Sequence, residues 1–173
     1  MNLFEQILQF KGYPFAEAKK ELAALQAMGT DEFLNWQQQR AWQQVRFHYT
    51  YNPLYKKLVG NTIPDKWEDL PIVTKKDLQQ PLSSIITNGV NFKDCHTGNT
   101  SGSTGTPFFY AKDKMTHAMT WAVIADRYSW YGLTVASRQA RFYGIPKEFV
   151  ANSKEQLKDR MMNRERFSVF DLS

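Results

Sequence analysis

The sequence has a single cysteine, Cys95, so the chain cannot form an internal disulfide. It has no apolar run near the ~18 residues that a membrane-spanning helix needs. The first residues lack the basic segment and apolar core of a secretory signal peptide. The three histidines are not spaced like metal ligands and give no support for a structural zinc site. Together these absences favour a cytoplasmic protein with no membrane span.

Apolar and aromatic residues are abundant, at 42% and 14% of 173 residues, which is enough for a compact domain with a core. The net charge is +5, and much of the basic excess lies between Arg138 and Arg166. Acidic residues are scattered among these basic ones. We therefore interpret the segment as a solvated basic face and do not expect a nucleic-acid partner.

Residues 1–90 are predicted to be mainly helical. Apolar spacing indicates a helix that begins near Pro14 and stops near Gly29. A third helix, with Thr30 as its cap, should end at Asn52 because the residue before a proline avoids helical angles. Its expected apolar positions include Leu34.

Residues 91–173 alternate between strand-like and helical patterns. The fold class predicted for the chain is therefore α/β, a helical amino-terminal region followed by a partial mixed sheet with flanking helices. We treat residues 1–173 as a single partial domain, since the chain stops directly after a strand-like run. The expected strands are 108–110, 138–145 and 167–172, and the expected helices are 113–131 and 152–166.

A small-residue octet, Thr100–Pro107, reads Thr-Ser-Gly-Ser-Thr-Gly-Thr-Pro. Its glycines permit left-handed angles, so several backbone N–H groups can turn toward one anion, and its hydroxyls can donate hydrogen bonds to phosphate oxygens. It is not a Walker loop, because the Gly-Lys-Ser/Thr ending is missing. A hairpin turn or a Gly/Ser linker is the alternative. The candidate phosphate-binding residues are Thr100, Ser101, Gly102, Ser103, Thr104, Gly105 and Thr106.

The octet resembles the phosphate-binding signature of the acyl-adenylate-forming (AMP-binding) superfamily. The surrounding sequence is most similar to the phenylacetate–CoA ligase branch and its capsular-polysaccharide relatives of the CapK type. The octet is a fairly specific signal, whereas the other stretches are weak singly. These stretches are Asn52–Tyr55, Asp69–Lys75, Arg138–Gly144 and Arg166–Ser168.

The resemblance implies an ATP-dependent ligase that works with Mg²⁺. A carboxylate would react with ATP to give acyl-AMP, and the acyl group would pass to CoA or another acceptor, in a pathway related to capsular or surface polysaccharide. Phe108 stands where many members have lysine, and the later adenine-, magnesium- and ribose-binding motifs are missing. We therefore expect the chain alone to be inactive, as an amino-terminal part lacking a carboxy-terminal portion or partner subunit. The alternative is a truncated, non-catalytic nucleotide-binding or interaction module.

Catalytic residues cannot be assigned from the sequence. Lys112 and Lys114 are candidate substitutes for the missing cation. Arg138 and Arg141 could reach phosphate or an acidic substrate, with exposed strand ends as the alternative. Other weighed residues are His48, His96 and His117, for which packing is favoured, Cys95, a small side chain without an evident base, and Trp36, Trp42, Trp121 and Trp130, which should mark core and helix packing.

Overall fold

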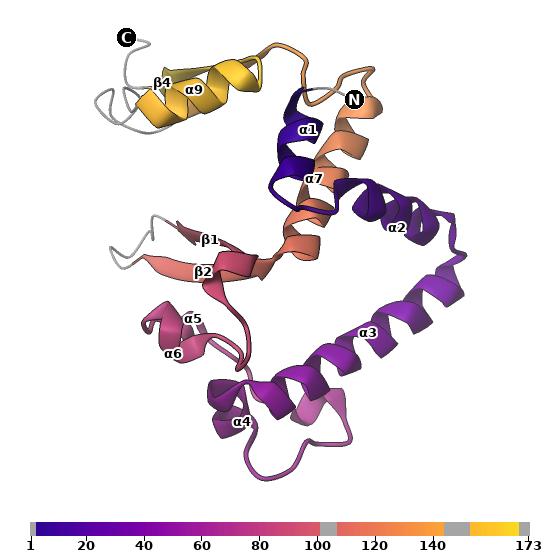
Figure 1. Ribbon diagram of the computed structural model, residues 1–173. Coiled ribbons are helices and arrows are strands. Elements are labelled where there is room, and N and C mark those ends of the chain that lie inside the picture. Colours follow the sequence, from indigo (N-terminus) through magenta and orange to yellow (C-terminus); the bar gives the residue numbers. More distant parts are fainter. Residues whose placement is uncertain (1–2, 101–106, 144–152, 170–173) are drawn as a thin grey trace. The chain divides into compact units, whose positions relative to one another are not determined.

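The computed structural model describes residues 3–100, 107–143 and 153–169 (Figure 1). The chain divides into two compact units. Unit 1 comprises residues 1–22 and 115–173, and unit 2 comprises residues 23–114.

Unit 1 is built from helices and a parallel pair of strands. Its elements are α1 (Leu3–Phe10), most of α2 (Phe15–Ala27), α7 (Lys114–Ser129) from its second residue, β3 (Gln139–Tyr143), α9 (Ser153–Met161) and β4 (Arg164–Ser168). The longest of these helices, α7, is followed by Gly132 with a φ of 68°, where the Leu133 N–H donates back to the Tyr128 carbonyl and closes the helix end.

The core of unit 1 is apolar and lies where α1, α2 and α7 meet. Phe4 and Leu8 lie one helical turn apart on α1, and Ala118 and Ala122 do the same on α7, so each pair faces the core together. The alanines let the helices approach closely, and the Phe4 ring packs edge-on against Trp121 at a centroid distance of 4.5 Å. The remaining buried members are Phe15, Ala18, Val135 and Met162.

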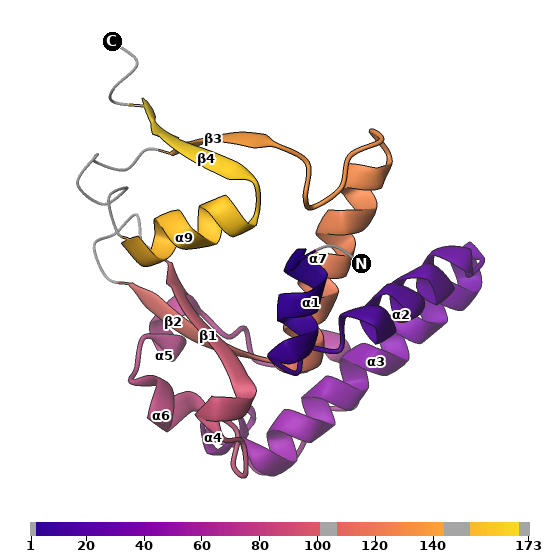
Figure 2. The same cartoon turned by 45° about the horizontal axis from the view of Figure 1, so that its top comes forward.

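The second part of unit 1 is a β3–α9–β4 segment. The strands pair in parallel from Gln139 opposite Arg164 to Tyr143 opposite Ser168, and α9 packs against β4 (Figure 2). Helix α9 ends at Met161 and Asn163 turns the chain with a φ of 50°. The prediction that helix continues to residue 166 and strand begins at 167 is therefore wrong by several residues, because this turn starts β4 early.

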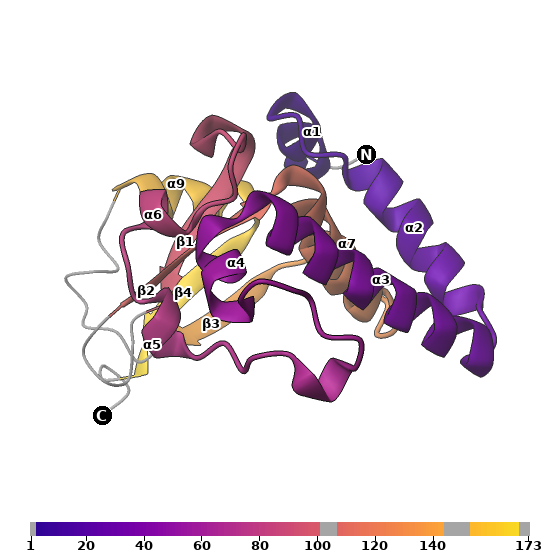
Figure 3. The same cartoon turned by 90° about the horizontal axis from the view of Figure 1, so that it is seen from below.

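Unit 2 consists of helices and a β-hairpin (Figure 3). Helix α4 follows α3 directly, and α6 contacts both α4 and β2. The elements are α3 (Thr30–Tyr51), α4 (Pro53–Val59), the 3₁₀ turns η1 (Trp67–Asp69) and η2 (Phe92–Asp94), α5 (Lys75–Leu78), α6 (Leu82–Ile85), β1 (Cys95–Thr100) and β2 (Phe108–Asp113).

A buried polar cluster joins these segments at Asn52, between α3 and α4. The Asn52 Oδ1 accepts a 2.9 Å hydrogen bond from the Tyr55 N–H, which caps α4. Its Nδ2 donates to the Ile85 carbonyl at 2.9 Å and to the Thr87 hydroxyl at 3.3 Å. The Thr87 hydroxyl also lies 3.3 Å from His48 Nδ1, and burial lowers the pKa of His48.

The mixture of helices with small sheets confirms the general α/β class. Within the described residues, however, the strands form two separate two-stranded sheets, one antiparallel and one parallel, instead of a single mixed sheet. Gly29, not Thr30, occupies the cap position of α3. None of the helices in the described ranges combines the length and apolar content that crossing a bilayer requires.

Two side chains that the sequence assigned to packing are exposed in the structure. Leu34 is 54% exposed on α3, and Trp130 is 63% exposed after α7. Trp130 instead packs beneath the Arg127 guanidinium, 5.3 Å from its ring centroid. The helical period puts a residue on a face but does not decide whether another element covers that face.

Candidate functional site

The octet connects the two strands of the unit 2 hairpin. Strands β1 and β2 pair antiparallel from Cys95 opposite Asp113 to Thr100 opposite Phe108. Thr100 and Phe108 are therefore neighbours across the ladder, so the chain leaves β1 and enters β2 at adjacent positions. Both strands belong to unit 2, which excludes the linker between domains but leaves the hairpin-turn alternative open. The predicted phosphate-binding residues 101–106 lie outside the described residues.

Close packing at Gly98 fixes the strands near the octet. Gly98 lies opposite Tyr110 in the ladder. A Cβ added at Gly98 would lie 2.6 Å from the Tyr110 hydroxyl oxygen and 2.7 Å from its Cζ. The Tyr110 ring therefore occupies the space over Gly98 on that face of the hairpin, which explains a glycine inside a strand.

A groove lies beside the hairpin in unit 2. It encloses about 540 Å³.

 Its walls are the apolar side chains of Leu82, Phe92 and Phe109, and the remaining lining comes from Thr97, Gly98 and Asn99 on β1. Phe92 and Phe109 are 40% and 45% exposed, so the groove offers apolar surface to a ligand next to the strand that leads into the octet.

The lysines that follow the octet are both engaged by neighbours. Lys112 Nζ lies 5.4 Å from the centroid of the Tyr110 ring, and Lys114 Nζ forms a 3.8 Å ion pair with Asp94. The Asp94 contact holds Lys114 at the base of the hairpin, whereas Lys112 contacts Tyr110, which pairs with Gly98 in the middle of the ladder. That Lys112 or Lys114 substitutes for the missing cation stays a prediction, which these contacts do not test.

Cys95 begins β1 at the base of the hairpin and is half-buried. Burial raises the pKa of its thiol, and the nearby carboxylates of Asp113 and Asp94 raise it further. The thiol is consequently protonated at neutral pH. This agrees with the prediction of a small packed side chain and argues against a nucleophile.

The three histidines lie on different elements of the two units. His117 lies on α7, where its Nε2 accepts a 3.2 Å hydrogen bond from the Trp121 indole and its ring packs against Tyr13. His48 belongs to the polar cluster at Asn52. His96 lies within β1, opposite Lys112. Among the described residues, no group of three or more histidine, cysteine or acidic side chains could hold a metal ion.

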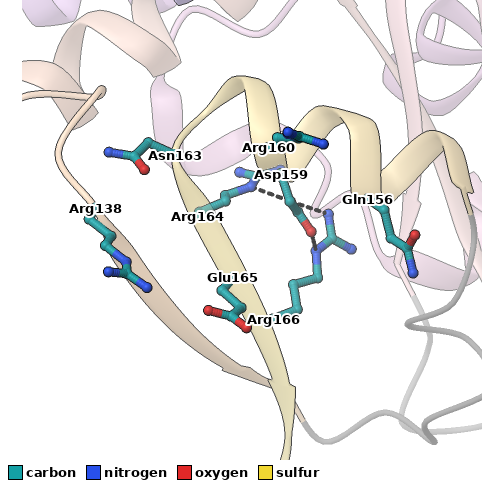
Figure 4. Close-up of a pocket in the computed structure, with 8 residues that line it drawn as sticks. All are labelled: Arg138, Gln156, Asp159, Arg160, Asn163, Arg164, Glu165 and Arg166. Carbon is teal, nitrogen blue, oxygen red and sulfur yellow. Dashed lines mark hydrogen bonds and ion pairs between the residues drawn. The ribbon is translucent and has the colours of Figure 1, made fainter.

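A second polar site lies in unit 1 between α9 and β4 (Figure 4). Asp159 is buried, and its carboxylate accepts hydrogen bonds from Arg164 Nε and from Arg166 Nη2, the latter at 3.1 Å. Arg166 Nε lies 2.6 Å from the other carboxylate oxygen. The cavity around this cluster encloses about 570 Å³, and its lining also includes Arg138, Gln156, Arg160, Asn163 and Glu165.

The two arginines that the sequence singled out are separated by this arrangement. Arg138 lines the cavity, whereas Arg141 bonds to Gln139 Oε1 at 2.9 Å and to the Tyr128 hydroxyl at 3.4 Å. Sequence reasoning missed Asp159 and Arg164. The signal that could have found them is the helical spacing of 156, 159 and 160, followed by the strand alternation of 164 and 166.

No family model, curated protein or solved structure matches this chain.

Proposed function

We propose that this chain is the amino-terminal, phosphate-binding part of an ATP-dependent adenylate-forming ligase of the phenylacetate–CoA ligase or CapK-like type. The pairing of Thr100 with Phe108 is the observation that carries the proposal. This pairing brings the end of β1 next to the start of β2, and the segment that connects them in the sequence is short and rich in glycine and hydroxyl groups. Such a segment can turn several N–H groups toward one anion.

The donor set of the octet fits a triphosphate. Thr100, Ser101, Ser103, Thr104 and Thr106 supply hydroxyl donors, and Gly102 and Gly105 permit close backbone approach. The octet contains no carboxylate, so Mg²⁺ would be held mainly by the phosphates, where it would spread their negative charge. The chain's own contribution is to bind and orient the nucleotide, because positioning and electrostatics dominate such reactions.

The groove beside β1 is a candidate for the carboxylate substrate. Its walls of Leu82, Phe92 and Phe109 suit an apolar acyl group, while the Thr97 hydroxyl and the Asn99 amide supply polar contacts. The groove and both ends of the octet lie on the same hairpin. A rigid hairpin would hold the acyl group and the nucleotide in a constant relation, which is the positioning that acyl-adenylate formation needs.

Calorimetric titration of the full chain with ATP and Mg²⁺ tests whether the octet binds the phosphates of ATP. Gly105→Ala should weaken ATP binding by about tenfold or more, because a Cβ narrows the approach of backbone to phosphate. Gly29→Ala is the matched control, since a Cβ there meets no atom within 4 Å. Equal ATP affinity in the wild type and Gly105→Ala, or no ATP binding by the wild type, would contradict the proposal that the octet binds phosphate.

ATP–pyrophosphate exchange with a panel of carboxylates tests whether the chain alone can form an acyl-adenylate. We expect no exchange by the chain alone, because the adenine-, magnesium- and ribose-binding motifs are missing from its sequence. ATP binding without exchange would fit both the ligase part and the non-catalytic module. Robust exchange by the isolated chain would show that the missing motifs are not needed and would reject that expectation.

A further inference from the structure

We propose that the cavity between α9 and β4 in unit 1 is a binding site for the phosphate group of a small molecule, with Arg160 and Arg164 as its principal ligands. The eight residues that line this cavity include four arginines and two carboxylates, which leaves an excess of two positive charges. The site is separate from the octet and goes beyond the proposed ligase function. It is built entirely from residues of unit 1.

The negative charge at the floor of the cavity is already neutralised. Asp159 is 7% exposed, and guanidinium groups from Arg164 and Arg166 contact its carboxylate. Strand alternation directs these two arginines to the same face of β4 and places Glu165 on the other face. Figure 4 shows Arg164 and Arg166 converging on Asp159 while Glu165 points away from it. An entering anion therefore meets guanidinium groups at the floor.

Arg164 is a buried cation with bonding capacity left over. Its side chain is only 8% exposed, and it uses Nε to contact Asp159. Within the described ranges it has no further hydrogen-bond partner, so its two terminal nitrogens are available where the side chain lines the cavity. A desolvated guanidinium with two parallel donors matches the spacing of two phosphate oxygens.

Arg160 supplies a second cation from the helix. Gln156, Asp159 and Arg160 follow the helical spacing that puts them along one stripe of α9, and they line the cavity together with Asn163 from the turn after the helix. Arg160 is exposed and has no ion-pair partner among the described residues. The Gln156 amide adds an uncharged donor, whereas the Asn163 amide already donates to the Ala136 carbonyl at 3.0 Å. This set of guanidinium and amide donors favours the three oxygens of a phosphate over the two of a carboxylate.

Calorimetric titration of the full chain with inorganic phosphate, ribose 5-phosphate and acetate at low ionic strength tests the site. Inorganic phosphate should bind more tightly than acetate. Tighter binding of ribose 5-phosphate than of inorganic phosphate would identify a phosphate ester as the ligand, and equal binding would identify the free anion. Acetate that binds as tightly as phosphate would overturn the proposal.

Arg160→Gln should weaken phosphate binding by about tenfold, because it removes one charge-assisted contact. Arg40→Gln is the matched control, since Arg40 is an exposed arginine of α3 in unit 2 that bonds only to Gln43 among the described residues. Equal weakening by both variants would mean that phosphate senses the net charge alone and would overturn the site.

Arg164→Lys separates ligand binding from folding. Lysine keeps the positive charge beside Asp159 but removes the paired terminal donors, so phosphate binding should weaken while the fold is retained. Unchanged phosphate affinity in a folded Arg164→Lys protein would contradict the role given to Arg164. The octet variant Gly105→Ala should leave phosphate binding at this site unchanged, so failure of the ligase proposal and failure of this one can be told apart.

Discussion

Each of the two units is stabilised internally by a different kind of interaction. Unit 1 has an apolar core in which Phe4, Leu8 and Phe15 pack against the alanines of α7. In unit 2, Val45 is the only apolar side chain among the described residues that is buried, and the buried Asn52 and Thr87 join distant segments by hydrogen bonds. The hydrophobic effect does not depend on the direction of a contact, whereas a hydrogen bond requires a particular distance and angle between donor and acceptor. We therefore expect the stability of unit 1 to depend on the volume of its buried side chains and the stability of unit 2 on the geometry of its hydrogen bonds.

The largest effect is expected from Phe4→Ala in unit 1. Phe4 is 8% exposed and packs on Trp121, so its removal should lower the free energy of unfolding by about 3–5 kcal/mol. Phe10→Ala, in the same helix, is the control, because Phe10 is 93% exposed. Its effect should stay within about 0.5 kcal/mol. Denaturant unfolding followed by circular dichroism measures both, and similar losses would refute the placement of the core.

A smaller effect is expected from Asn52→Ala in unit 2. The substitution removes the cap of α4 and leaves the Ile85 carbonyl and the Thr87 hydroxyl without this partner, which should cost about 2–3 kcal/mol. Asn61→Ala is the control, because Asn61 is exposed and it is its backbone carbonyl that accepts the Tyr49 hydroxyl. Unfolding midpoints in urea compare the two. Equal midpoints would mean that the polar cluster does not hold unit 2.

The smallest effect is a pH dependence from His48. Burial lowers the pKa of His48 in the folded chain below its ordinary value of 6.5, so the unfolded chain binds more protons when the pH falls below that value. The stability of the wild type should therefore decrease as the pH falls from 7 through 6.5, and this part of the decrease should be absent in His48→Gln. Urea midpoints measured across this range test it, and identical slopes for both proteins would contradict the burial of His48.

Local chemistry made much of the helical region predictable. Asn52-Pro53 ends α3 and starts α4 because proline restricts the residue before it and suits the first helical position, and Gly60 and Gly132 adopt the positive φ that ends a helix. The strand that follows the octet was also found, from the aromatic composition of 108–110.

Pairing between distant segments was not predictable in the same way. Which strands share a sheet depends on contacts between parts of the chain, and a single mixed sheet was expected where two small sheets form. The start of β4 at Arg164 depends on the turn at Asn163, whose side chain donates to the Ala136 carbonyl at 3.0 Å. The exposure of Leu34 and Trp130 likewise depends on which faces other elements cover.

The sequence by itself determined the end of α3 at Asn52, the apolar stripes of α1 and α7 and the composition of the octet, because these follow from the angles and side chains of neighbouring residues. Only the tertiary structure decided that Thr100 meets Phe108 and that Asp159 meets Arg164 and Arg166. The physical reason is that a cross-strand pair and a buried ion pair gain their energy from groups that the fold must first bring together.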